Sequence, residues 1–120
     1  MTIAGKVVLV LEDEPIIAMV IEDMLLEGGA EPIFASTFAE ATSAIEAGGI
    51  DAAVLDVNVH GARSYPVAVQ LRAAGIPFIF ATGYGPALHE EEFARIPTIV
   101  KPYGLPELTA ALDQAAAANA

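Results

Sequence analysis

Apolar residues along the chain fall into two alternating kinds of segment. The first kind is a short unbroken run rich in β-branched residues, which is typical of a strand buried on both faces, as in a parallel sheet. Such runs predict strands at Val7–Leu11, Ala52–Leu55, Phe78–Ala81 and Ile96–Val100, with a weaker fifth at Pro32–Ala35.

Between these runs, apolar residues recur with the spacing of a helix that buries one side. Pro15 suits a first helical position and Gly28–Gly29 is a stop signal, so we expect a helix between them. Its buried stripe is predicted to contain Ile17, Val20, Ile21, Met24 and Leu25. Further helices are predicted over residues 38–47, over 66–74 and from about Leu105, with a short, weakly held helix over 84–95.

The alternation of strands and helices predicts the fold class. Short connections between a strand, a helix and the next strand favour right-handed βαβ units in one sheet. We therefore expect an α/β fold with a single doubly wound, five-stranded parallel sheet and helices on both faces. These elements fill the 120 residues of the chain, so one domain is expected.

The composition excludes several classes of function. The chain has 5 basic and 16 acidic side chains and a net charge of −11, whereas nucleic acids and anionic membranes are bound by clustered Lys and Arg. The absence of cysteine excludes a disulfide scaffold, a thiolate zinc site and a cysteine nucleophile. The first apolar run is too short for a signal peptide or a membrane helix, so we expect a cytoplasmic domain.

Polar residues follow the predicted strands at one edge of the sheet. Ligands of open α/β sheets bind beyond the carboxyl ends of the strands, so these residues are the candidates for a site. They are Glu12 and Asp13 after the first strand, Asp56 and Asn58 after the third, Thr82 after the fourth and Lys101 after the fifth.

Such a cluster of carboxylates needs positive charge. Two carboxylates about 4 Å apart repel each other by roughly 4 kcal/mol at an effective dielectric constant of 20, and Lys101 supplies only one compensating charge. A hard divalent cation with oxygen ligands, most simply Mg²⁺, would balance the remainder. A carboxylate beside Mg²⁺, a lysine and a hydroxyl has the groups that formation of an aspartyl phosphate requires.

Four runs in the sequence carry a resemblance to a known family. VLVLEDEP, LDVN, FATGYG and VKPY resemble, in order and spacing, the receiver domain of two-component response regulators, and the resemblance covers the whole chain. The FATGYG and KPY runs further resemble the FAT GUY subgroup of alphaproteobacterial single-domain response regulators. The resemblance implies the flavodoxin-like strand order 2-1-3-4-5. It also implies a receiver domain over residues 1–120 with no output domain.

The resemblance assigns a phosphoacceptor and its metal ligands. Asp56 would accept a phosphoryl group from a histidine kinase or a phosphotransfer protein. Asp13 and Asp56 would bind Mg²⁺ directly, together with the backbone carbonyl of Asn58. Glu12 would act through a metal-bound water.

The resemblance also assigns the groups that contact the phosphoryl oxygens. Thr82 would donate a hydrogen bond to them, and Lys101 would pair with them. The family has a cis peptide between this lysine and the following proline, here Pro102. From the glycines and the few core anchors of the segment from Gly83 to Arg95, we also expect phosphorylation to shift this segment and change the binding of a downstream protein. The chain would lose its phosphoryl group by autodephosphorylation and would not be a multiple-turnover enzyme.

The sequence departs from the family pattern at two places. Thr98 stands where the family usually has an aromatic switch residue, and Tyr84 and Tyr103 flank the predicted site as candidates for that role. The loop after the phosphoacceptor contains His60–Gly61 in place of the usual proline-containing turn, which predicts a different kinase specificity or dephosphorylation rate. We expect both histidines of the chain to be surface residues.

Two other functional classes are compatible with part of the pattern. A Mg²⁺-dependent phosphatase with an aspartyl nucleophile has similar chemistry, but it needs a second acid two residues after the nucleophile, where this chain has Asn58. A binding module that competes for a partner without being phosphorylated is the other alternative.

Overall fold

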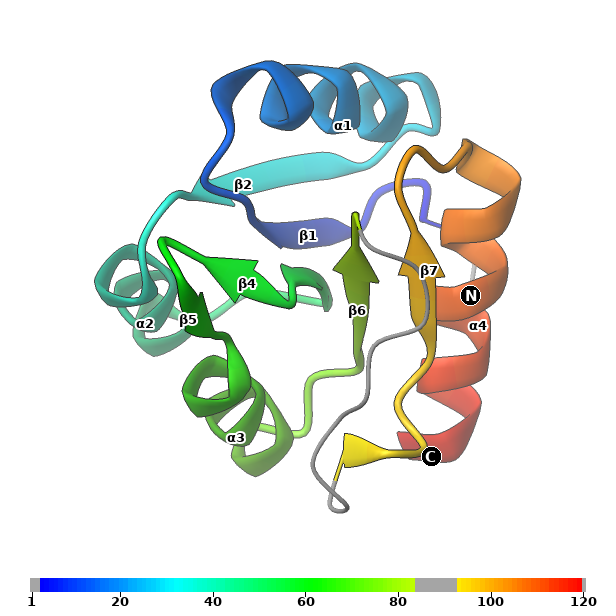
Figure 1. The fold of residues 1–120 in the computed structure, drawn as a ribbon. Coiled ribbons are helices and arrows are strands. Elements are labelled where there is room, and N and C mark those ends of the chain that lie inside the picture. The colour runs from blue at the N-terminus through cyan, green and yellow to red at the C-terminus, as the bar shows by residue number, and fades with distance from the viewer. Residues whose placement is uncertain (1–2, 84–92, 120) are drawn as a thin grey trace.

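The computed structural model describes residues 3–83 and 93–119. Its main feature is one five-stranded parallel sheet with the strand order β2-β1-β3-β6-β7 (Figure 1). The strands are β1 (Val7–Leu11), β2 (Glu31–Ala35), β3 (Ala52–Asp56), β6 (Phe78–Thr82) and β7 (Thr98–Val100). Because β6 and β7 are the fourth and fifth strands of this sheet along the chain, the order is the predicted 2-1-3-4-5.

Helices cover both faces of the sheet (Figure 1). They are α1 (Pro15–Glu27) and α4 (Leu105–Asn119) on one face, and α2 (Phe38–Ala47) and α3 (Tyr65–Ala73) on the other. Successive strand residues serve opposite faces: Val8 packs in the cluster with α1 and α4, and Leu9 in the cluster with α2 and α3. The predicted doubly wound α/β fold is therefore confirmed.

Two details of the prediction were wrong. The last strand begins at Thr98 instead of Ile96, and the intervening Pro97 has no N–H to donate to the sheet. Val20 was expected on the buried stripe of α1 but is 57% exposed. One residue corresponds to about 100° around a helix, so Val20 lies at the edge of the stripe centred on the buried Ile21 and Leu25.

A small antiparallel hairpin, which the sequence analysis did not predict, follows the third strand of the sheet. It consists of β4 (Asn58–Val59) and β5 (Ala62–Arg63). The connecting residues His60 and Gly61 both have positive φ, 51° and 81°, as a tight two-residue hairpin turn requires. Strands of two residues are too short for a periodic pattern of apolar residues to reveal them.

The short helix expected over residues 84–95 lies mostly outside the described residues. Among the described residues, no helix is long and apolar enough to span a lipid bilayer.

Candidate functional site

The register of β1 and β3 brings the predicted acidic residues together. Leu11 lies opposite Leu55. The residues that follow them in the chain, Glu12 and Asp56, therefore lie at the same level of the sheet. Carboxylate oxygens of Glu12, Asp13 and Asp56 all lie within 4.8 Å of one another. The juxtaposition expected from the strand ends is therefore observed.

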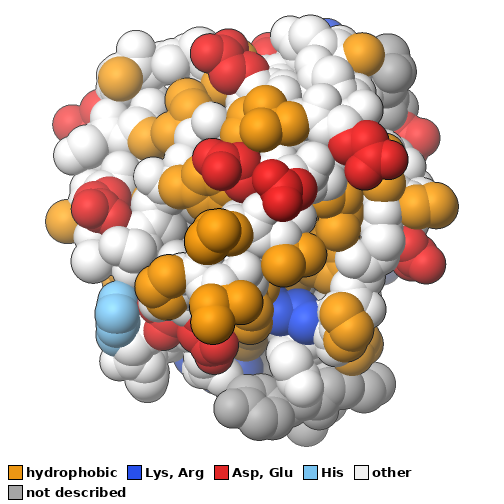
Figure 2. Space-filling model, turned by 90° about the horizontal axis from the view of Figure 1, so that it is seen from above, with side chains coloured by type: hydrophobic (Ala, Val, Ile, Leu, Met, Phe, Trp, Pro, Cys, Tyr) orange, Lys and Arg blue, Asp and Glu red, His pale blue; other side chains and the backbone are white. Residues whose placement is uncertain are grey.

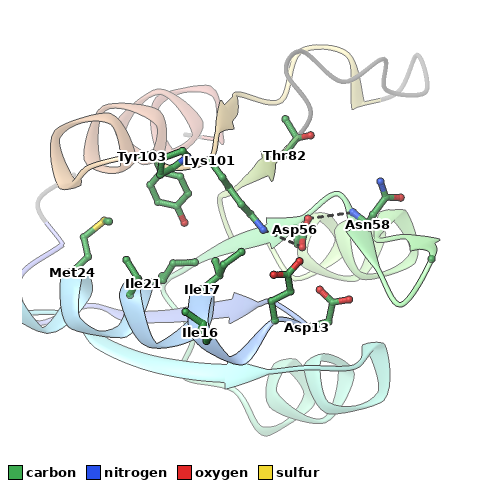
Figure 3. Close-up of a pocket in the computed structure, with 15 residues that line it drawn as sticks. Asp13, Ile16, Ile17, Ile21, Met24, Asp56, Asn58, Thr82, Lys101 and Tyr103 are labelled. Atoms are coloured by element: carbon green, nitrogen blue, oxygen red, sulfur yellow. Dashed lines mark hydrogen bonds and ion pairs between the residues drawn. The ribbon is translucent and has the colours of Figure 1, made fainter.

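The register of β6 and β7 adds Lys101 to this cluster. Thr82 lies opposite Val100, and the backbone N–H of Lys101 donates a hydrogen bond of 2.8 Å to the carbonyl oxygen of Thr82. The Lys101 ammonium donates to Oδ2 of Asp56 at 3.1 Å (Figure 3) and to Oε1 of Glu12. The Lys101–Pro102 peptide bond is cis, as the family resemblance implies.

The charges of this site are held away from water. The side chain of Glu12 is 1% exposed, and those of Lys101 and Asp56 are each 12% exposed. Burial raises the pKa of Asp56 from its ordinary value of 3.8 to about 6, because the neighbouring Glu12 carboxylate adds to the effect of burial and the attraction of Lys101 only partly opposes them. Burial alone would lower the pKa of Lys101, but the hydrogen bond to Glu12 and the charge of Asp56 raise it overall.

The carboxylate of Asp13 is held from the other side by the β4–β5 hairpin. The backbone N–H of His60 donates a hydrogen bond of 2.9 Å to Oδ2 of Asp13. Burial alone would raise the pKa of Asp13, but this hydrogen bond and local polar contacts lower it below its ordinary value. Neighbouring carboxylates of one cluster therefore differ in environment, with the pKa of Asp13 lowered and that of Asp56 raised.

Asn58 and Thr82 complete the polar side of the site. The backbone N–H of Asn58 donates to Oδ1 of Asp56 at 3.3 Å. Thr82 is the last residue of β6 and is 5% exposed, and in Figure 3 its side chain lies above Asp56. The structure thus gathers every residue that the sequence analysis assigned to the site.

A cavity of about 800 Å³ opens beside the acidic cluster. One end is polar and includes Asp13, Asp56 and Lys101, and the other is apolar and is formed by α1 and Tyr103 (Figure 3). Among the described residues, the buried Tyr103 hydroxyl has no hydrogen-bond partner. Burial and the charges of Glu12 and Asp56 raise the pKa of Tyr103, so the phenol remains a neutral donor.

The outer surface of α1 beside this cavity carries several exposed apolar side chains. Figure 2, which looks onto this side of the molecule, shows hydrophobic side chains gathered around acidic ones. Those that are exposed on α1 include Ile16 (77%), Met19 (64%), Val20 and Leu26.

The chemistry of the cluster suits a hard cation. Three carboxylates within 4.8 Å of one another are oxygen ligands of the kind that Mg²⁺ takes, and Lys101 balances only one of their charges. The residues present therefore fit the Mg²⁺ ion that the sequence analysis expected.

Two residues near the site make contacts or have environments that the sequence analysis did not predict. His60 was expected to be a surface residue, which its 61% exposed side chain confirms, and its backbone N–H in addition donates a hydrogen bond to Asp13. Tyr103 was a candidate on position alone, and the structure adds its buried hydroxyl. The sequence did indicate that the turn at His60 differs from the usual proline-containing turn. It does not show which carboxylate the backbone of this turn contacts.

The fold and this site define a doubly wound α/β domain with an acidic pocket and a lysine at the carboxyl edge of its sheet. The chain is 40% identical to SdrG from Sphingomonas melonis Fr1, whose solution structure aligns over 95% of this chain and 98% of that chain with a TM-score of 0.81. The BeF3-activated conformation of SdrG, from Pseudomonas melonis Fr1, is 41% identical over 94% of this chain and 98% of that chain, with a TM-score of 0.79.

A third solved structure is the response regulator TrrA from Thermotoga maritima in complex with Mg²⁺-BeF. It is 27% identical and covers 91% of this chain and 97% of that chain, with a TM-score of 0.79. No family model and no curated protein matches the sequence. With these similarities, the chain belongs to the response regulator receiver family. The narrower resemblance to the FAT GUY subgroup stays a prediction.

Proposed function

We propose that this chain is a phosphorylation-dependent receiver in two-component signalling, with Asp56 as the phosphoacceptor. The observation that carries the proposal is the convergence of Glu12, Asp13, Asp56 and Lys101 at one edge of the sheet. An Oδ atom of Asp56 would attack the phosphorus of a phosphohistidine. The P–N bond would break, and its electron pair would stay on the imidazole of the donor.

The acidic residues would hold the Mg²⁺ ion that this transfer needs. Asp13 and Asp56, with the backbone carbonyl of Asn58, would be direct ligands, and Glu12 would interact indirectly. When bound, Mg²⁺ neutralises charge on the phosphoryl oxygens. The fit of three clustered carboxylates to a hard cation supports this assignment, as does the Mg²⁺-BeF complex of TrrA.

Thr82 and Lys101 would receive the phosphoryl group. Lys101 already donates to Asp56, so a phosphoryl group on that carboxylate lies within reach of the same ammonium. Thr82 ends the neighbouring strand and lines the same cavity, and its hydroxyl would donate to a phosphoryl oxygen. The added charge would shift the conformation of the segment from Gly83 to Arg95, most of which lies outside the described residues. This shift would change the binding of a downstream protein.

The exposed apolar face of α1 is the proposed docking surface for the phosphodonor, a histidine kinase or a phosphotransfer protein. Ile16 lines the cavity that contains Asp56 and is 77% exposed, and Met19 continues the apolar face. A protein that delivers a phosphoryl group to Asp56 through this cavity would cover the α1 residues at its edge. Burial of apolar area there would contribute to its affinity.

Incubation with acetyl phosphate and Mg²⁺ tests the phosphoacceptor. We expect a stoichiometric, base-labile phosphoryl adduct on the wild type, detected by intact-protein mass spectrometry. Asp56→Asn should form no adduct, whereas Asp23→Asn, which changes an exposed carboxylate of α1, should behave as the wild type.

The same experiment separates the two alternatives. Repeated turnover of a phosphomonoester would indicate the aspartyl phosphatase, although the residue two positions after Asp56 is Asn58 and not an acid. Failure to form any adduct would indicate a module that binds its partner without phosphorylation. We expect a single phosphorylation followed by autodephosphorylation, with no repeated turnover of a phosphomonoester.

A further inference from the structure

The β4–β5 hairpin places His60 between the ends of two strands of the main sheet. Its backbone N–H donates to Oδ2 of Asp13, which follows β1. Its ring Nε2 lies 2.9 Å from the carbonyl oxygen of Ser36, which follows β2. A carbonyl oxygen accepts hydrogen bonds and cannot donate them, so Nε2 must carry the proton in this contact.

The far end of this connection is anchored to a helix. The backbone N–H and the hydroxyl of Ser36 both donate to Oε1 of Glu40, at 2.7 and 2.8 Å. The backbone N–H of Glu40 in turn donates to the Thr37 hydroxyl at the N-cap of α2. The His60 ring is therefore tied to a capped helix start and not to a free loop.

The hairpin turn determines where the His60 N–H points. His60 has a φ of 51°, and with Gly61 it forms the two-residue turn between β4 and β5. Gly61 has no side chain, so of the two turn residues only His60 can contact the neighbouring loop with its side chain, and it does so at Ser36. The backbone N–H of the same residue donates to Asp13, so one turn residue contacts both neighbouring loops.

We propose that His60 is a positioning residue for the Mg²⁺ site, holding the carboxylate of Asp13 through its N–H while its ring anchors the turn to Ser36. The inference rests on the proposed function, since it assigns Asp13 as a metal ligand. A carboxylate has two oxygens, so one held by His60 leaves the other for the metal. Groups that orient a ligating carboxylate in this way typically change metal affinity by about 10–100-fold when they are lost.

Two substitutions of similar size separate the ring contact from the turn. His60→Gln keeps an N–H donor at a similar reach, whereas His60→Leu has comparable bulk and no donor. Both variants place a non-glycine residue at the same positive φ, so the free-energy cost of that backbone conformation is the same in both. The measurements on the full chain are the Mg²⁺ dissociation constant by calorimetry and the hydrogen exchange rate of the residue 60 amide by NMR without metal.

We expect His60→Leu to weaken Mg²⁺ binding by about tenfold and to speed exchange of the residue 60 amide, with His60→Gln close to the wild type in both. Equal affinities in all three proteins, or equal weakening in both variants, would overturn the inference while leaving the proposed function intact. A wild type that binds no Mg²⁺ would instead overturn the proposed function and this inference with it.

Discussion

Lys101 donates a hydrogen bond of 3.1 Å to Asp56, which lies 45 residues earlier in the chain. The same ammonium also binds Glu12, 89 residues earlier. One cation is therefore shared between two carboxylates that are almost fully removed from water. With three clustered carboxylates and one ammonium, the site keeps an excess of negative charge, and this excess has measurable consequences for stability and binding.

The first prediction concerns the pH dependence of stability. The pKa of Asp56 is raised to about 6 in the folded protein from an ordinary value of 3.8, so the folded state binds this proton more tightly than the unfolded state. The resulting stabilisation is fully present below about pH 4 and is lost as the pH rises through about 6. After screening by nearby solvent, we expect Asp56→Asn to be more stable than the wild type by about 1–3 kcal/mol at pH 7.5.

Urea unfolding in EDTA at a series of pH values measures this effect. The advantage of Asp56→Asn should shrink between pH 7.5 and pH 4, because the wild-type carboxyl becomes protonated. Asp23→Asn serves as the control, since Asp23 is exposed on α1. An advantage that is constant over this pH range would contradict the raised pKa of Asp56.

The second prediction concerns the shared cation. Lys101→Met removes the partner of two buried carboxylates, and loss of one member of a buried ionic network costs about 3 kcal/mol or more. We expect a loss of this order in the free energy of unfolding at pH 7.5. Lys6→Met is the matched control, because Lys6 precedes β1 at the opposite edge of the sheet. Equal losses in the two variants would show that Lys101 contributes no specific stabilisation.

The sequence predicted the fold and the composition of the site for a clear physical reason. Unbroken apolar runs at Val7–Leu11 and Phe78–Ala81 mark strands buried on both faces, and the carboxyl ends of parallel strands share one edge. The positions of Asp56 and Lys101 at that edge thus follow from strand type alone. The boundary at Thr98 was not predictable from hydrophobicity, because it depends on the missing N–H of Pro97.

The features that the sequence did not predict depend on contacts between residues that are far apart in the chain. The bond between His60 and Asp13 joins a two-residue turn to a loop 47 residues earlier. Tyr103, whose hydroxyl has no hydrogen-bond partner within the described part of the chain, lines the same cavity as α1. No local pattern of residue types encodes either relationship, since both arise from the packing of separate elements.

The third prediction concerns metal binding. Mg²⁺ at 100 times its dissociation constant should stabilise the wild type by about 2.7 kcal/mol at pH 7.5, and EDTA should remove this gain. Because ligands must be deprotonated and Asp56 titrates near 6, the affinity should fall as the pH drops from 7.5 to 5. Thermal unfolding with and without Mg²⁺ measures both effects. Asp13→Asn should lose most of the stabilisation, and full stabilisation of this variant would remove Asp13 from the ligand set.

The fourth prediction concerns the Tyr103 hydroxyl. A buried polar group without a partner costs about 1–3 kcal/mol, so Tyr103→Phe should stabilise the unphosphorylated protein by about 1 kcal/mol. Urea unfolding measures the change, and Tyr65→Phe is the control for loss of a hydroxyl elsewhere in the core. A loss of stability in Tyr103→Phe would show that the hydroxyl is satisfied in solution.

The fifth prediction concerns the apolar face of α1. Ile16→Glu places a charge at a residue that is 77% exposed, so folding should be little affected, while the proposed docking surface for the phosphodonor gains a charge that must be desolvated. We expect phosphotransfer from a cognate phosphorylated histidine kinase to slow by at least about tenfold, since burial of one unpaired polar group costs more than 1 kcal/mol. Phosphorylation by acetyl phosphate, which needs no docking surface, should keep its wild-type rate.

Val69→Glu is the matched control, because Val69 is 50% exposed on α3 at the opposite face of the sheet. If Val69→Glu slowed transfer and Ile16→Glu did not, the phosphodonor would approach Asp56 over α3 and not over α1.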